Sequence, residues 1–207
     1  MSTHCHSLIC LGDSYTIGES VALYAGFPYQ TIQLLRSAGL HFHAPEIIAK
    51  TGWASFELAE HLVKLQLNDS YDFVSLLIGV NNHYRELDVE SFSEDLSFLI
   101  KKAIHLTGGN SNYVYLMSIP DWTITTFGRS NKKNNTADTI ASFNETCKLL
   151  SLKNGCNFID LTKYTNLAET DLSLLAADGL HYSEKAYAYW AKELANKIQE
   201  SIHQKGK

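Results

Sequence analysis

The sequence predicts an α/β fold in which helices cover both faces of a mostly parallel, doubly wound sheet. Short apolar runs alternate along the chain with longer segments of helical period, which is typical of strands joined by crossover helices. The chain has 207 residues, a length at which one hydrophobic core is buried efficiently and a second would be cramped. We therefore expect one domain over residues 1–207, with residues 1–6 as a flexible tail.

Five apolar runs are predicted as the strands of this sheet. Each run is rich in β-branched, aromatic or other apolar side chains, as strands that are buried on both faces require. In chain order they are residues 8–11, 47–49, 73–78, 113–117 and 157–159.

Five longer segments carry apolar residues at helical spacing and are predicted as the helices that cover the sheet. They are residues 27–38, 55–67, 89–106, 136–153 and a last helix that opens at Ser183. Gly39, Gly108 and Gly155 stand where three of these helices end, as glycine often does. The polar segment 121–135 follows neither period and is predicted as a long surface loop.

Composition and charge narrow the class of protein. The residues are 45% hydrophobic and 19% charged, which is ordinary for a soluble globular domain. The net charge is -5 and the lysines are scattered, so no basic face is available for nucleic acid. The first apolar run has no basic flank and is too short for secretion or a membrane span, which predicts a cytoplasmic protein.

Cysteines and the first histidines carry no predicted site. Cys5, Cys10, Cys147 and Cys156 include no C-x-x-C pair, so free thiols are expected rather than a disulfide framework. The cluster His4-Cys5-His6 offers metal ligands, but at a chain end an unordered tail explains it better. We assign the cluster no function and predict no metal site.

A serine follows the first predicted strand, in the triplet Gly12-Asp13-Ser14. Ligands bind at the carboxyl ends of the strands in open parallel sheets, so this position favours a functional role for Ser14. Taken alone, the triplet is more typical of a turn in which Asp13 and Ser14 bond to nearby backbone amides. We interpret Asp13 as an organiser of that loop.

A carboxylate and an imidazole lie three positions apart in Asp178-Gly-Leu-His181, before the last helix. A serine hydroxyl needs an imidazole to accept its proton, and the imidazole needs a carboxylate to fix its tautomer and stabilise its cation. An isolated pair of this kind is more typical of a helix that begins at His181 and is capped by Asp178.

Two further segments follow the second and third predicted strands at the same edge of the sheet. They contain Gly52, in Thr-Gly-Trp, and Asn81, in Gly-Val-Asn-Asn. The side-chain amide of Asn81 and the backbone N–H groups of Gly52 and Ser14 are candidate donors to a developing oxyanion. Each segment by itself also fits a turn or a helix end.

Four short motifs occur in a fixed order between Gly12 and His181: Gly-Asp-Ser, Gly, Gly-x-Asn and Asp-x-x-His. This order resembles the signature of SGNH (GDSL-like) hydrolases. The resemblance implies a three-layer, flavodoxin-like α/β/α fold with a five-stranded, mostly parallel sheet. The implied roles are nucleophile and first oxyanion donor for Ser14, further donors for Gly52 and Asn81, base for His181 and its orienting partner for Asp178. Two positions depart from the usual pattern: Asn82 replaces an aspartate, and Tyr182 replaces a proline.

The resemblance predicts a serine esterase that hydrolyses a carboxylic ester through an acyl-enzyme, without metal or organic cofactor. A short acyl or acetyl group is expected because the sequence has no long apolar surface segment for a long-chain lipid. Substrate contacts are expected from Tyr15, Trp53, Asn82, Tyr84, Arg85, Trp122 and Tyr182. A lysophospholipase, a thioesterase and a noncatalytic carbohydrate- or lipid-binding relative remain alternatives. The sequence lacks G-x-S-x-G, G-x-G-x-x-G, a P-loop and H-E-x-x-H, which disfavours α/β-hydrolase, nucleotide-binding and metallohydrolase chemistry.

Overall fold

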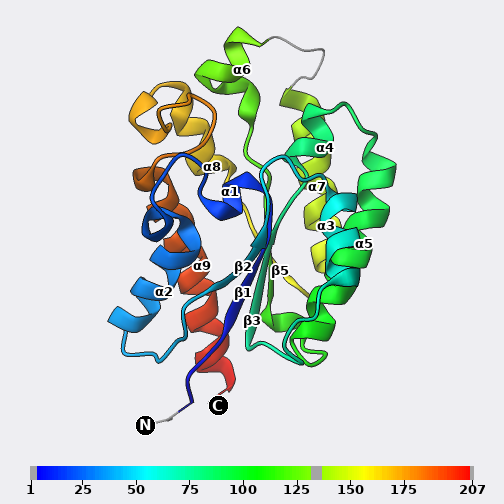
Figure 1. Cartoon of the computed structure of the whole chain (residues 1–207), viewed down its shortest axis with the longest axis vertical. Helices are drawn as coiled ribbons and strands as arrows, with labels where there is room; N and C mark the ends of the chain where they lie inside the picture. Colours follow the sequence, from blue (N-terminus) through cyan, green and yellow to red (C-terminus); the bar gives the residue numbers. More distant parts are fainter. Residues whose placement is uncertain (1–3, 132–136, 206–207) are drawn as a thin grey trace.

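A five-stranded parallel sheet forms the middle layer of the structure, a computed structural model that describes residues 4–131 and 137–205 (Figure 1). The strands are β1 (Leu8–Gly12), β2 (Glu46–Ala49), β3 (Phe73–Leu77), β4 (Val114–Met117) and β5 (Asn157–Ile159). They pair in the order β2-β1-β3-β4-β5, and every pair is parallel. The chain therefore switches direction across the sheet at the boundary between β1 and β3, where ligands bind in folds of this kind. The predicted flavodoxin-like sheet is confirmed.

Helices form the two outer layers. α2 (Phe27–Ser37) and α9 (Glu184–Lys205) pack together on one face, and α3 (Ser55–Lys64), α5 (Val89–Leu106) and α7 (Ala137–Lys153) cover the other (Figure 1). The shorter helices are α1 (Ser14–Ile17), α4 (Val80–Tyr84), α6 (Thr126–Ser130) and α8 (Thr162–Thr165), with 3-10 turns at Leu23–Ala25, Ser111–Tyr113, Trp122–Ile124, Asn166–Glu169 and Leu172–Leu174. Among the described residues, no helix combines the length and the apolar character that crossing a membrane requires.

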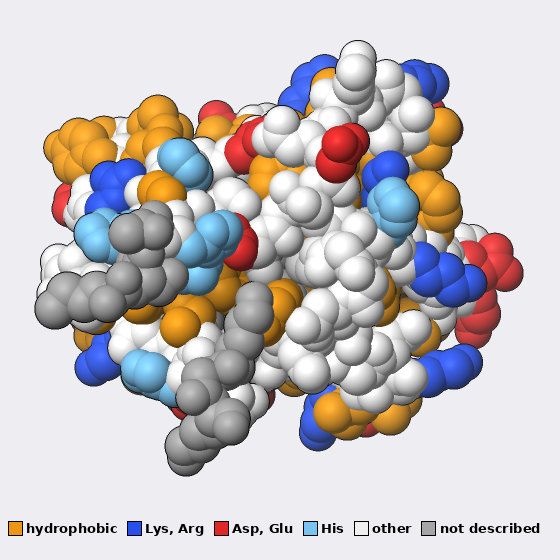
Figure 2. Space-filling view, turned by 90° about the horizontal axis from the view of Figure 1, so that it is seen from below, with side chains coloured by type: hydrophobic (Ala, Val, Ile, Leu, Met, Phe, Trp, Pro, Cys, Tyr) orange, Lys and Arg blue, Asp and Glu red, His pale blue; other side chains and the backbone are white. Residues whose placement is uncertain are grey.

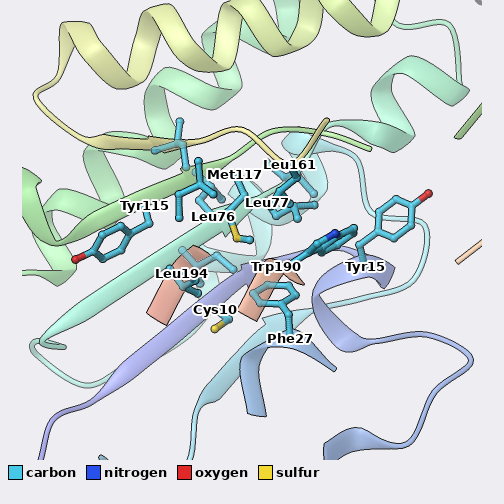
Figure 3. Packing of buried hydrophobic residues seen from close by; sticks show 14 of the residues in the cluster. Cys10, Tyr15, Phe27, Leu76, Leu77, Tyr115, Met117, Leu161, Trp190 and Leu194 are labelled. Carbon is cyan, nitrogen blue, oxygen red and sulfur yellow. The ribbon is translucent and has the colours of Figure 1, made fainter. Parts of the chain in front are cut away.

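The core lies on both faces of the sheet because its central strands are buried on both faces and are mostly apolar. All residues of β1 and β3 are buried. Figure 3 shows Leu76 and Met117 from the strands packed near Phe27, Trp190 and Leu194 from α2 and α9. Burial of each large side chain contributes about 1.5–3 kcal/mol, which fixes the two helices against the sheet.

The segment 121–135 differs from the predicted long loop. It contains a 3-10 turn at Trp122–Ile124 and the helix α6. Trp122 and Thr125 are buried, and Thr125 Oγ1 caps α6 by accepting a hydrogen bond from the N–H of Gly128. Capping side chains hold short helices that lack a clear apolar period. Residues 132–135 lie outside the described residues.

The amino-terminal segment also differs from the expected tail. His6 forms a parallel bridge with Phe42, and its N–H donates to the carbonyl of His41 at 2.7 Å. Residues 4–6 are therefore held at the amino end of the sheet, whereas residues 1–3 lie outside the described residues. All four cysteines are free thiols, as predicted.

Candidate active site

Three segments that the sequence singled out meet at the carboxyl ends of β1 and β3, at the upper end of the sheet in Figure 1. β1 leads into α1, which begins at Ser14, and β3 leads through Gly79 into α4. The turn at 178–181 comes just before α9 and reaches the same place, since the side chains of His181 and Ser14 are hydrogen-bonded. Residues 167 positions apart in sequence thus share one site.

Gly12 and Asp13 place Ser14. A Cβ at Gly12 would lie 2.1 Å from Thr16 Oγ1 and 2.3 Å from the carbonyl oxygen of Leu77, so only glycine allows this approach of β1, α1 and β3. Asp13 Oδ1 accepts a hydrogen bond from the N–H of Tyr15 at 3.0 Å and so caps α1. The result is a sharp turn that presents Ser14 at the first position of the helix.

A continuous chain of hydrogen bonds joins the three candidate catalytic side chains. His181 Nε2 lies 2.9 Å from Ser14 Oγ, and His181 Nδ1 lies 2.6 Å from Asp178 Oδ2. The ring of His181 packs edge-on against Tyr15, with centroids 5.4 Å apart. The imidazole is therefore fixed with one nitrogen on the hydroxyl and the other on the carboxylate, the arrangement that proton transfer from serine needs.

Four hydrogen bonds hold the carboxylate of Asp178. Oδ1 accepts from the N–H groups of Leu180 and His181, both at 2.9 Å, while Oδ2 accepts from His181 and from Ser20 Oγ at 2.5 Å. Partial burial alone would raise the pKa of Asp178, but the bonds from Ser20, His181 and the backbone outweigh it and hold that pKa well below its usual range. Asp178 is thus a carboxylate at neutral pH.

Ser20 had not been identified from the sequence. It is an exposed residue in the loop after α1, and its φ of +66° is in the left-handed region. Its hydrogen bond to Asp178 joins positions 158 apart. The only local signal is the short polar stretch Gly18-Glu-Ser, which is ordinary turn composition.

The candidate oxyanion donors lie next to each other at the ends of β2 and β3. Asn81 Nδ2 donates to the carbonyl of Trp53 at 3.0 Å, which ties α4 to the segment after β2. Gly52 has a φ of +82°, and its carbonyl accepts a hydrogen bond from Arg85, which also pairs with Glu57 at 2.9 Å. Arg85 therefore contacts the backbone beside the candidate oxyanion site.

A small pocket of about 170 Å³ opens beside Ser14 and His181. Its lining residues are Ser14, Tyr15, Val80, Asn81, Tyr84, Trp122, Phe127, Leu180 and His181. The structure thus brings three of the expected substrate contacts, Tyr15, Tyr84 and Trp122, to the pocket. Val80, Phe127 and Leu180 were not singled out from the sequence, although Val80 and Leu180 are the neighbours of Asn81 and His181.

The other expected substrate contacts are placed differently. Asn82 and Tyr182 are buried at 1% and 0% exposure, and neither lines the pocket. The amide of Asn82 exchanges two hydrogen bonds with Ser55, at 2.7 and 2.8 Å, while the ring of Tyr182 packs 5.1 Å from that of Trp190. We therefore correct these two expectations: both residues are part of the packing beneath the site.

Trp53 and Arg85 lie outside the pocket lining as well. The indole of Trp53 packs 4.8 Å from the ring of His61, in a separate surface depression with Glu57. Arg85 is bound to Gly52 and Glu57.

Asp13 is a buried acid that lies outside the hydrogen-bond chain of Asp178, His181 and Ser14. Burial raises the pKa of Asp13 to about 7, although the hydrogen bond from Tyr15 opposes the shift. Its role as an organiser of the loop is confirmed by the cap on α1. Among the described residues, the three-ligand cluster of histidine and carboxylate is His4, His6 and Asp72, at the opposite end of the sheet.

Comparisons with known proteins agree with this geometry. A family model described as GDSL-like Lipase/Acylhydrolase matches residues 10–189. No curated protein matches the chain. Among solved structures, the lipase/acylhydrolase from Enterococcus faecalis is similar over 95% of this chain and 96% of its own, with 22% identity and a TM-score of 0.76.

Two other solved structures are similar over most of their length. The acetylxylan esterase Axe2 from Geobacillus stearothermophilus has 18% identity and a TM-score of 0.74, covering 93% of this chain and 94% of its own. The protein TesA has 15% identity and a TM-score of 0.75, covering 94% and 98%. At these identities the likeness shows a shared fold.

Proposed function

Because the chain belongs to the GDSL-like lipase/acylhydrolase family, whose members hydrolyse ester bonds, we propose that it is a serine esterase with Ser14 as nucleophile. The observation that carries the proposal is the hydrogen-bond chain Asp178–His181–Ser14, with contacts of 2.6 and 2.9 Å, beside a pocket. A hydroxyl that is bonded to an oriented imidazole and lines a cavity has the placement that covalent catalysis requires.

In the proposed reaction, His181 Nε2 takes the proton of Ser14 as its oxygen attacks the ester carbonyl carbon. The protonated imidazole then gives that proton to the leaving alcohol, and an acyl-enzyme remains. Water, activated by the same imidazole, releases the acid and restores Ser14. Asp178 stays ionised throughout, because its four hydrogen bonds favour the charged form.

The oxyanion of the tetrahedral intermediate would be bound by the N–H groups of Ser14 and Gly52 and by the Asn81 amide. Ser14 is the first residue of α1, so its N–H has no partner within the helix. The amide of Asn81 has two donors, and one of them is used on Trp53. Loss of one donor of this kind costs on the order of 100-fold to 1000-fold in kcat.

We propose an acetyl or other short acyl group as the substrate's acid part. The pocket is small, about 170 Å³, and is lined largely by the apolar and aromatic side chains of Val80, Tyr84, Trp122, Phe127 and Leu180. These side chains suit a few carbon atoms better than a long chain. The similarity to an acetylxylan esterase over 93% of this chain is consistent with this choice. The cytoplasmic location and the cofactor-free reaction remain predictions from the sequence.

The test is a chain-length series of p-nitrophenyl esters, from acetate to palmitate, run beside acetylated sugars and a lysophospholipid. We expect acetate or butyrate to be turned over best, whereas a preference for palmitate or the lysophospholipid would favour the lysophospholipase alternative. Ser14→Ala and His181→Ala should abolish turnover while the circular dichroism spectrum is retained.

Matched controls are Ser70→Ala and His203→Ala, because both residues are exposed and lie outside the pocket. These two variants should keep wild-type rates. Retained turnover in Ser14→Ala, or no turnover of any ester by the wild type, would contradict the proposal, and the latter would favour a noncatalytic binding protein.

A further inference from the structure

Three potential metal ligands meet at the amino end of the sheet, where residues 4–6 lie beside the start of β3. The ligand atoms of His4, His6 and Asp72 all lie within 4.8 Å of one another. Asp72 Oδ1 is 2.7 Å from His4 Nε2 and 3.4 Å from His6 Nδ1. Figure 2 shows this face of the molecule, on which histidine side chains gather near a carboxylate.

The backbone fixes the position of His6. Its N–H donates to the carbonyl of His41 and its carbonyl accepts from the N–H of His43, at 2.7 and 2.9 Å. Its ring packs on Phe42 and Phe73, with centroids 5.0 and 5.7 Å away. His4 lies two positions earlier, and residues two apart in an extended chain project to the same side.

The carboxylate of Asp72 is oriented by Ser7. The N–H and the hydroxyl of Ser7 both bond to Oδ2, at 2.9 and 3.1 Å, which leaves Oδ1 directed at the imidazoles. A carboxylate oriented by neighbouring hydrogen-bond donors is how proteins commonly prepare an oxygen ligand.

From this geometry we infer that His4, His6 and Asp72 form a binding site for a divalent transition-metal ion of the Zn²⁺ type. Two imidazole nitrogens and one carboxylate oxygen are common Zn²⁺ ligands, and water completes the tetrahedron. Ligand atoms about 2.0–2.1 Å from the ion are roughly 3.3–3.4 Å apart, which is the separation between His6 Nδ1 and Asp72 Oδ1. Mg²⁺ and Ca²⁺ prefer all-oxygen sites and fit this set poorly.

The site is distinct from the candidate active site. Asp72 precedes β3 and His6 precedes β1, whereas Ser14 and Asn81 follow these strands. A five-residue strand spans roughly 17 Å, so an ion here takes no part in ester hydrolysis. It would instead fasten the first residues of the chain to the start of β3 and stabilise the folded state.

The test is isothermal titration of untagged, metal-stripped protein with ZnCl₂. We expect one equivalent to bind to the wild type, and His4→Ala to weaken binding at least about 10-fold to 100-fold, the loss that even an outer-shell partner causes. His4 is suited to the test because its side chain is 56% exposed. Its removal therefore leaves the fold intact.

Two variants serve as matched controls. His43→Ala removes an exposed histidine in the same region, and Cys5→Ser removes the exposed thiol between the two ligands. Both should bind Zn²⁺ as the wild type does. Equal losses in His43→Ala and His4→Ala would show unspecific binding by surface histidines and overturn the proposal, as would no binding by the wild type or equal affinity for Mg²⁺.

Two further measurements do not rely on the titration. Zn²⁺ at about 100 times its Kd should raise the Tm of the wild type by roughly 5–10 °C, with a much smaller rise for His4→Ala. A crystal grown with Zn²⁺ should give an anomalous difference peak between the three side chains. A peak elsewhere, or an equal Tm rise in His4→Ala, would contradict the assignment.

Discussion

Replacing Ser20 by alanine removes one of the four hydrogen bonds that hold Asp178. Bonds to charged groups contribute about 1.5–3 kcal/mol. The side chain of Asp178 is 35% exposed, so solvent screening reduces the effect to about 1 kcal/mol. If that energy is lost from the transition state, kcat/KM falls about fivefold. Initial rates on p-nitrophenyl acetate would measure it.

Two other variants of Ser20 distinguish the effect of losing its hydroxyl from the effect of its backbone conformation. Ser20 has a φ of +66°, a conformation that costs a residue with a Cβ about 1 kcal/mol relative to glycine. Ser20→Gly should therefore be more stable than Ser20→Ala but equally slow, and Ser20→Thr should keep the hydroxyl and most of the activity. Wild-type kcat/KM in Ser20→Ala, or a loss confined to the alanine variant, would refute the reasoning.

The pH dependence of Ser20→Ala follows from the sign of the Asp178 shift. The folded-state pKa of Asp178 lies below its unfolded value, so its interactions stabilise the fold above the unfolded pKa. This contribution is lost as the pH falls through the folded pKa. Without the hydroxyl the folded-state pKa moves up towards the unfolded value, which the substitution does not change. We therefore expect urea unfolding to show a smaller acid-dependent loss of stability, and initial rates to show a loss of activity that begins at a higher pH.

Three other substitutions test the surroundings of the site. Burial raises the pKa of Asp13 to about 7, so the folded chain keeps a proton that the unfolded chain releases near pH 4, and the free energy of unfolding falls as the pH rises between these values. In Asp13→Asn the urea midpoint should therefore change less with pH than in the wild type. The same pH dependence in both proteins would contradict this reasoning. Gly12→Ala places a Cβ 2.3 Å from the carbonyl oxygen of Leu77 and should lower the free energy of unfolding by about 3 kcal/mol. If urea unfolding shows that the variant is as stable as the wild type, the close approach is refuted. Phe127→Ala widens the pocket and should shift the ester preference towards longer acyl chains; an unchanged ranking would place the acyl group elsewhere.

The sheet and its main helices could be predicted because their signals are local. The apolar runs predicted β1 and β5 to within one residue at each end, and helical spacing predicted α5 completely. Strands buried on both faces need continuous apolar runs, and amphipathic helices need a repeated apolar face. Short helices such as α1 and α4 were missed because a single turn carries no period.

The main residues of the candidate site could be predicted for a different reason. Ser14, Asn81 and His181 follow strand ends or precede a helix, and parallel strands bring such positions to one edge. The lining of the pocket could not be predicted in the same way. Phe127 reaches it through the turn and helix of the segment after β4, and nothing in the local sequence shows that fold.

Contacts between distant segments account for the remaining differences. Ser20 meets Asp178 across 158 positions, and His4 meets Asp72 across 68. From the local sequence alone, Ser20 is part of an ordinary turn and His4 is part of a chain end. Only the assembled sheet brings their partners within hydrogen-bonding distance.

The most direct test of the account is whether Ser14 is an activated nucleophile. Intact protein would be treated with a fluorophosphonate, and the modified peptide identified by mass spectrometry. We predict one adduct, on Ser14, that is absent in Ser14→Ala and forms far more slowly in His181→Ala. An adduct on another residue, or the same labelling rate without the imidazole, would contradict the central claim.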